Sequence, residues 1–86
     1  MNNEIISNAK AVLDLCRGKG LQIATVESCT GGLVCAALTA IAGSSDVVER
    51  GFVTYSNQAK SEQVAVPAAL IEAYGAVSEA VARAMA

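Results

Sequence analysis

The sequence contains no histidine and no tryptophan, and its 86 residues include one proline, one phenylalanine and two tyrosines. Without histidine the chain cannot supply a Ser-His-Asp triad, and a metal site such as a zinc centre is not expected. Aromatic residues make up 3% of a chain that is 53% hydrophobic, so the core must be built from alanine, valine, leucine and isoleucine. Such a composition suits helices packed closely on a sheet.

Charge is also scarce, and this excludes several kinds of partner. The formal net charge is −2 and the six basic residues are scattered, so no nucleic-acid partner is expected. A small phosphorylated ligand is compatible with this charge, because one lysine and a helix N-terminus can hold a phosphate. The longest nearly apolar run, residues 33–42, is too short to cross a bilayer, so no membrane contact is expected. The three cysteines show no CxxC pair, and we expect a cytoplasmic protein without disulfides.

The order of apolar patterns predicts an α/β fold. A helix is predicted over residues 3–17, with Asn2 or Asn3 as its cap. A strand over 21–26, a turn over 27–32, a buried helix over 32–41 and a second strand over 51–55 follow. Strand, helix and strand at this spacing form a right-handed βαβ unit with parallel strands. The ends of both strands therefore lie at one edge of the sheet, where open α/β sheets bind ligands.

Three further helices are predicted after the second strand. Asn57 caps the first, which covers 58–64, Pro67 begins the second, which ends at Gly75, and Ser78 caps the third. Two strands alone make a marginal sheet, and the last helical pattern is still running at Ala86. We therefore expect residues 1–86 to form a single three-layer α/β/α domain that is incomplete at its C-terminus. The apolar helix surfaces also predict a homo-oligomer.

The turn over residues 27–32 holds the first group of candidate site residues. Ser28 follows a strand and precedes a helix, so unpaired amides and the positive end of the helix dipole would stabilise an anion there. That anion is either a ligand phosphate or the oxyanion formed when Ser28 attacks a carbonyl. A plainer interpretation is that Ser28 or Thr30 only caps the helix, but capping does not need Gly31 and Gly32.

A second group follows the second strand, at Tyr55 and Lys60. A serine nucleophile needs a base, and without histidine the candidates are lysine, tyrosine or a carboxylate. Lys60 falls in the first turn of its predicted helix, where the dipole disfavours a cation; partial burial would add to this effect and favour a proton acceptor. The plainer interpretations are a solvated lysine and a core or edge tyrosine. Cys29 is a competing nucleophile, and Glu27 either is solvated or orients a polar ligand.

Taken together, four segments resemble the CinA C-terminal domain family in order and spacing: residues 24–32, 41–45, 51–60 and 75–78. Members of that family hydrolyse the carboxamide of nicotinamide mononucleotide to nicotinate mononucleotide and ammonia, within pyridine-nucleotide recycling. The resemblance implies that Ser28 is the nucleophile, that Tyr55 and Lys60 activate it, and that no cofactor is needed. The implied contacts to this small-molecule substrate are Glu27, Thr30, Gly31, Gly32, Ser45 and Asn57.

Length sets this chain apart from the family it resembles. Family domains are about twice as long, and their second half carries a Gly-Ile-Ala-Gly-Pro-type loop near the site, which this chain lacks. Two alternatives to an amidohydrolase therefore stay open. One is a nucleotide-binding or assembly module in which the turn at Ser28 holds a phosphate without chemistry, and the other is a fragment that is inactive by itself.

Overall fold

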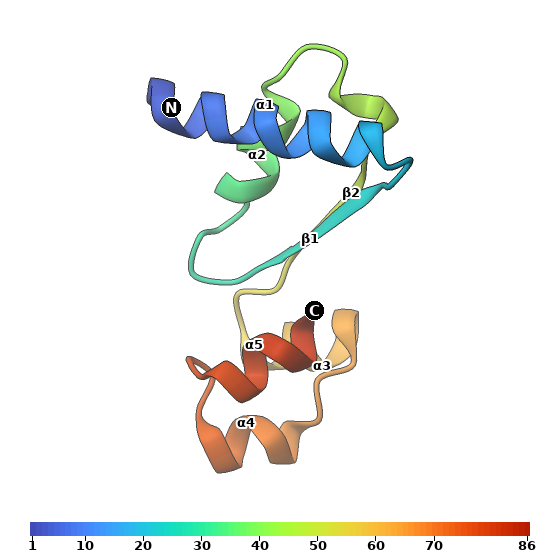
Figure 1. Cartoon of the computed structure of the whole chain (residues 1–86). Coiled ribbons are helices and arrows are strands. Elements are labelled where there is room, and N and C mark those ends of the chain that lie inside the picture. Colours follow the sequence, from blue (N-terminus) through green and yellow to red (C-terminus); the bar gives the residue numbers. More distant parts are fainter.

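The computed structural model describes residues 1–86 and places helices on both sides of a small sheet (Figure 1). Its elements are, in chain order, α1 (Asn3–Gly18), β1 (Ile23–Glu27), α2 (Leu33–Thr39), the short 3₁₀ helix η1 (Ser44–Asp46), β2 (Val48–Val53), α3 (Asn57–Val64), α4 (Ala68–Tyr74) and α5 (Glu79–Met85). No helix combines the length and the hydropathy that crossing a bilayer requires. The predicted α/β fold is confirmed, and every predicted helix and strand is present.

The two strands pair in parallel, as the spacing of the βαβ unit predicts. The register joins Ile23 to Val48 and Glu27 to Val53, with one irregularity directly after Ile23. Because parallel strands run in the same direction, the turn after β1 and the segment after β2 leave the sheet at the same edge. The sheet thus brings the two groups of candidate site residues to neighbouring positions.

The second strand begins and ends earlier than the sequence predicts. β2 covers residues 48–53 instead of 51–55, so Tyr55 lies beyond the strand. Glu49 and Arg50 form an exposed ion pair at its start. An exposed strand does not need an apolar sequence. Because these two residues are charged, the apolar pattern did not indicate that β2 begins before them.

α1 and α2 cover one face of the sheet (Figure 1). The core between them consists of small aliphatic side chains: Ala9, Leu13, Ala37, Leu38 and Val47. Gly51 lets β2 approach α2 closely, because a Cβ at this position would lie 2.8 Å from Thr25 Oγ1 and 2.9 Å from Cys35 Sγ. No larger residue fits at Gly51 without a shift of its neighbours.

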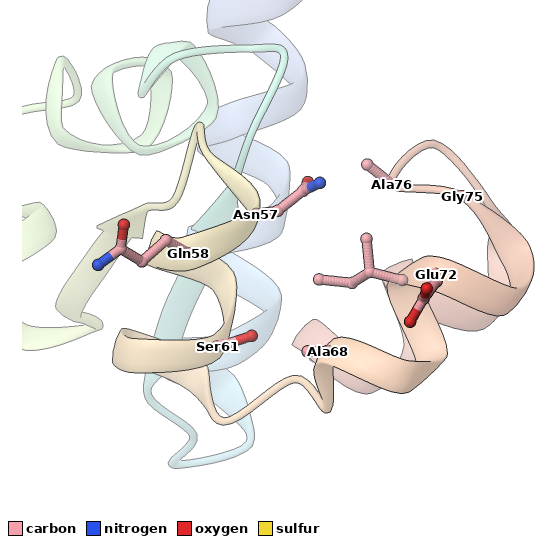
Figure 2. A pocket seen from close by; sticks show the side chains of 8 residues that line it. Asn57, Gln58, Ser61, Ala68, Glu72, Gly75 and Ala76 are labelled. Atoms are coloured by element: carbon pink, nitrogen blue, oxygen red, sulfur yellow. The ribbon is translucent and has the colours of Figure 1, made fainter.

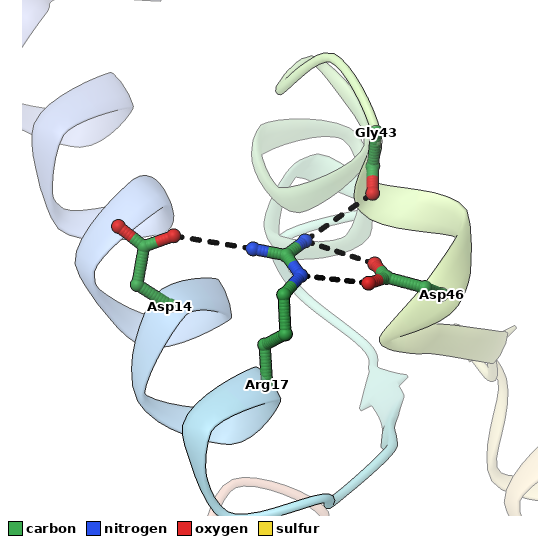
Figure 3. A network of polar contacts seen from close by, with 4 residues as sticks. All are labelled: Asp14, Arg17, Gly43 and Asp46. Carbon is green, nitrogen blue, oxygen red and sulfur yellow. Dashed lines mark hydrogen bonds and ion pairs between the residues drawn. The ribbon is translucent and has the colours of Figure 1, made fainter.

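The Arg17 side chain connects the end of α1 to η1 through hydrogen bonds and ion pairs (Figure 3). Its guanidinium donates to both carboxylate oxygens of Asp46, at 2.7 and 2.8 Å, and this raises the pKa of Arg17 and lowers that of Asp46. It also donates to the Gly43 carbonyl and to Asp14, at 3.2 Å each. Solvent screens these exposed charges, so the network orients η1 more than it stabilises the fold.

α3, α4 and α5 lie on the other side of the sheet and enclose a second core, made of Val66, Ile71 and Val81. Ser78 caps α5 as predicted, because its hydroxyl accepts a backbone N–H three residues further on. The prediction that Asn57 caps α3 is wrong: Ser56 is the cap and Asn57 is the first helical residue. Pro67 precedes α4 as its N-cap and is not its first residue, because its backbone is extended.

The two sides of the sheet are not packed equally well. Only 12 of the 86 residues are buried, and the Cα radius of gyration is 14.3 Å, against about 12 Å for a compact chain of this length. Between the second face of the sheet and α3 and α5 lies an apolar cavity of about 380 Å³. Its lining includes Ala24, Val26, Phe52, Ala82 and Met85. The helices α3–α5 therefore leave part of that face uncovered.

Candidate functional site

The carboxylate of Glu27, the last residue of β1, is hydrogen-bonded within the turn that follows this strand. Glu27 is only 4% exposed, and its carboxylate accepts the N–H of Val34 at 2.8 Å and that of Cys35 at 3.0 Å. Burial raises the pKa of this carboxyl, whereas the N–H groups of Cys35 and Val34 lower it. The Thr30 hydroxyl and the Gly32 N–H act in the same direction, and the pKa of Glu27 lies below its ordinary value. The ionised Glu27 carboxylate thus accepts N–H groups of the first turn of α2.

This arrangement corrects the expectation that the start of α2 is open to an anion of the ligand. The helix begins at Leu33 with Gly32 as its N-cap, and neither Ser28 nor Thr30 caps it. The Gly31 N–H donates to the Ser28 carbonyl at 3.0 Å. Gly31 and Gly32 have φ of 64° and 104°, values that favour glycine, so the turn itself requires them. The N–H groups that were expected to face an oxyanion or a phosphate are thus hydrogen-bonded to other groups of the chain.

Ser28 is half-buried and lies in a cleft of about 440 Å³ next to α5. Opposite the turn, the cleft is lined by residues of α2, of the loop before α5 and of α5 itself: Val34, Ala76, Val77, Ser78, Ala82 and Met85. The sequence had not indicated that the loop over residues 75–78 forms a wall of this site, although that loop is one of the four segments that carry the resemblance. A cleft with mostly apolar walls and a few hydroxyls suits a small, flat, partly apolar ligand.

Tyr55 and Lys60 contact each other but do not line this cleft. Lys60 is 2% exposed, and its Nζ donates to the backbone carbonyl of Tyr55 at 3.3 Å. The expected burial of Lys60 is therefore found, and a solvated surface lysine is ruled out. The Tyr55 side chain is 75% exposed, and neither residue lines the cleft around Ser28. The structure thus brings Tyr55 and Lys60 together without a side-chain contact to Ser28.

Thr54, a residue that the sequence did not single out, joins the ends of the two strands. It is fully buried, and both its N–H and its Oγ1 donate to the Glu27 carbonyl, at 2.7 and 3.1 Å. Ser28 and Tyr55 directly follow the two bonded residues. A threonine at a strand end is too common to have indicated this contact from sequence alone.

The two remaining predicted contacts lie further away. Asn57 and Ser61 line a second cavity of about 440 Å³ (Figure 2), which adjoins the cleft because Ala76 borders both. Ser45 lies in η1, before β2 begins, and is therefore at the opposite edge of the sheet from Ser28. Ser45 is not brought to the site. No group of three or more His, Cys, Asp or Glu side chains is placed to hold a metal ion.

The fold and the site define a class of protein: an α/β unit with a serine at the carboxyl edge of a parallel βαβ sheet. The model of the CinA C-terminal domain matches residues 6–86, and the chain belongs to this family. A CinA-like protein of Chlorobium phaeovibrioides is 53% identical over 77 residues, which are 90% of this chain and 18% of that protein.

Solved structures agree with this assignment. The competence/damage inducible protein of Agrobacterium tumefaciens is 45% identical, with a TM-score of 0.97 over 100% of this chain and 52% of that one. A CinA superfamily protein of Escherichia coli is 35% identical, with a TM-score of 0.93 over 100% of this chain and 51% of that one. The chain thus spans about half the length of these solved chains and about a fifth of the relative from Chlorobium.

Proposed function

We propose that this chain carries the nucleophile of an amidohydrolase that converts nicotinamide mononucleotide to nicotinate mononucleotide and ammonia. The observation that carries the proposal is the position of Ser28, half-buried in a mostly apolar cleft at the carboxyl edge of a parallel sheet. The walls of this cleft suit a flat pyridine ring. Membership of the CinA C-terminal domain family supports the same reaction.

The proposed reaction passes through an acyl-serine. Ser28 Oγ gives its proton to a base and attacks the carboxamide carbon, and the carbonyl oxygen becomes an oxyanion. When the carbonyl re-forms, the C–N bond breaks and the nitrogen takes up a proton and leaves as ammonia. Water then attacks the ester, which releases the carboxylate product and restores the serine hydroxyl. The scheme uses neither a metal ion nor an organic cofactor.

We assign the transfer of the Ser28 proton to Tyr55 and Lys60. They form one unit, since Lys60 Nζ lies 3.3 Å from the Tyr55 carbonyl, and Tyr55 follows the strand next to that of Ser28. Tyr55 is 75% exposed, and we propose that its side chain turns toward the cleft when substrate fills it and so completes the site. Catalytic hydrogen bonds often form only in the substrate complex.

We propose two of the expected residues as contacts to the substrate. Thr30 lines the cleft together with Ser28, and Asn57 lines the cavity that adjoins it at Ala76. We keep these two residues as contacts for the ribose phosphate of the substrate. Glu27, Gly31 and Gly32 act instead on the backbone of the turn.

Ammonia release from nicotinamide mononucleotide tests this proposal. We expect Ser28→Ala to lower turnover by about 1,000-fold or more, because the covalent route is lost. Cys29→Ala removes the exposed neighbouring thiol and should retain most of the turnover. Loss of activity in Cys29→Ala alone would transfer the role of nucleophile to the thiol. If the wild-type chain releases no ammonia, the proposed function fails for this chain.

A further inference from the structure

Two buried polar side chains directly precede the proposed catalytic residues and have no part in the reaction itself. Glu27 precedes Ser28, and Thr54 precedes Tyr55. Both are almost completely inaccessible to solvent. The Thr54 hydroxyl donates to the backbone carbonyl of Glu27, so the two residues are directly hydrogen-bonded. Burying such groups is unfavourable unless they are hydrogen-bonded, and each of their side-chain oxygens has a hydrogen-bond partner here.

We propose that Glu27 and Thr54 are positioning residues that fix Ser28 relative to Tyr55, and we call this pair the strand-end clamp. Its consequence for catalysis rests on the proposed function. The clamp connects β1, α2 and the end of β2 at Glu27, the last residue of β1. The Glu27 carboxylate accepts N–H groups at the start of α2, and the Glu27 carbonyl accepts the hydroxyl of Thr54, the residue after β2.

The geometry of the peptide bond carries the effect of the clamp to Ser28. The Glu27 carbonyl and the Ser28 nitrogen belong to one planar peptide group. Two hydrogen bonds from Thr54, at 2.7 and 3.1 Å, fix the direction of that carbonyl. They therefore also fix the plane in which the Ser28 nitrogen and Cα lie. Misplacement of a reacting atom by about 1 Å can cost about 100-fold in rate.

The other side of the clamp is held in the same way. Thr54 has no freedom of its own, because its N–H and its hydroxyl are both committed to Glu27. The next carbonyl, that of Tyr55, accepts a hydrogen bond from Lys60 Nζ at 3.3 Å. The peptide groups on both sides of the site are thus fixed by buried donors, whereas the Tyr55 side chain stays exposed.

Three variants test the clamp. Thr54→Val removes the hydroxyl but keeps the shape and the N–H, and Thr54→Ser restores the hydroxyl. Thr39→Val is a matched control, because the Thr39 hydroxyl bonds only to carbonyls within its own helix α2. If Thr54→Val does not fold, Glu27→Gln is the second variant, since its amide places a donor opposite a backbone N–H.

The amide spectrum of the whole chain gives a readout that does not depend on activity. In Thr54→Val we expect the amides of residues 28–30 to shift and the Gly31 amide, which donates to the Ser28 carbonyl, to exchange with solvent about threefold faster or more, while those of residues 9–13 stay unchanged. In Glu27→Gln the amides of Val34 and Cys35 should exchange faster as well. Thr54→Ser and Thr39→Val should match the wild type at residues 28–30. Unchanged amides at these positions in Thr54→Val would overturn the clamp.

Kinetics on nicotinamide mononucleotide test the catalytic consequence. We expect Thr54→Val to lower kcat about 10-fold or more with KM within about twofold, and Thr54→Ser to recover most of kcat. Equal kcat in Thr54→Val and the wild type, together with altered amides, would contradict a positioning role. If the wild-type chain shows no turnover, the proposed function fails while the amide spectra still decide whether the clamp controls the turn.

Discussion

The region from α1 to β2 and the region from α3 to α5 differ in how they are stabilised. In the first, two helices pack on a sheet around a core of five buried residues; in the second, three short helices pack around a core of three. The cleft lies between them, with Ser28 on the first region and Ala76, Val77 and Ala82 on the second. The first region therefore supplies the proposed nucleophile, and the second shapes the space in which a ligand lies.

The apolar cavity between the sheet and the second region makes this comparison testable. A cavity of about 380 Å³ means that few side chains connect the two regions there, so their local stabilities can differ. The variants below should affect one region more than the other.

The largest effect is expected from Leu13→Ala, in the core of the first region. Leu13 is almost fully buried, and its truncation should lower the free energy of unfolding by about 3 kcal/mol, measured by urea denaturation.

Val81→Ala, in the core of the second region, should lower amide protection mainly in α3–α5. Equal loss of protection across the whole chain in Val81→Ala would show that the two regions unfold as one.

A smaller effect is expected from Gly51→Ala, which tests the packing of β2 on α2. The added Cβ would lie 2.8 Å from Thr25 Oγ1 and 2.9 Å from Cys35 Sγ, and we expect a loss of about 1–3 kcal/mol. Gly18→Ala is the matched control, because nothing lies within 4 Å of its added Cβ, and it should not destabilise the chain. Equal melting temperatures for the two variants would contradict the close approach.

The pH dependence of stability tests Glu27, which belongs to the first region alone. Its pKa is lower in the folded state than in the unfolded state, so its contribution is fully present above the ordinary pKa of glutamate. This contribution is lost as the pH falls below about 4.5 and through the lowered pKa. Thermal melts between pH 7 and pH 3 should show a steeper loss in the wild type than in Glu27→Gln. Parallel curves would mean that Glu27 is not ionised at the start of α2.

The smallest effect is expected from Thr25→Val. The Thr25 hydroxyl is buried and has no hydrogen-bond partner, unlike the Thr54 hydroxyl at the end of the neighbouring strand. Replacing an unpaired buried hydroxyl with a methyl group should change the free energy of unfolding by less than about 0.5 kcal/mol or increase it. A loss of about 1 kcal/mol or more would show that the Thr25 hydroxyl makes a hydrogen bond in the folded chain.

The sequence predicted the βαβ unit because apolar periodicity and chain length restrict how two strands can be connected. It also predicted the cap at Ser78 and left that of α1 to Asn2 or Asn3, of which Asn2 is the cap; at both places a short polar side chain precedes an apolar helix. It did not predict where β2 begins, because exposed residues at a sheet edge need not be apolar.

The site was less predictable than the fold. The segment before α2 was expected to face a ligand phosphate or an oxyanion, and the pattern could not show that the carboxylate of Glu27 takes this place. Which way a side chain at a strand end points depends on register and packing rather than on local sequence. The same limit applies to Thr54, whose bonds depend on a residue 27 positions away, and to Ser45, which the connection to β2 places at the other edge.

The most direct test of the central claim is rapid quenching of the chain with nicotinamide mononucleotide, followed by mass spectrometry of its peptides. We expect a nicotinate mononucleotide acyl adduct on Ser28 that forms as ammonia is released and is absent in Ser28→Ala. Ammonia release with the adduct on Cys29, or undiminished release by Ser28→Ala, would contradict it.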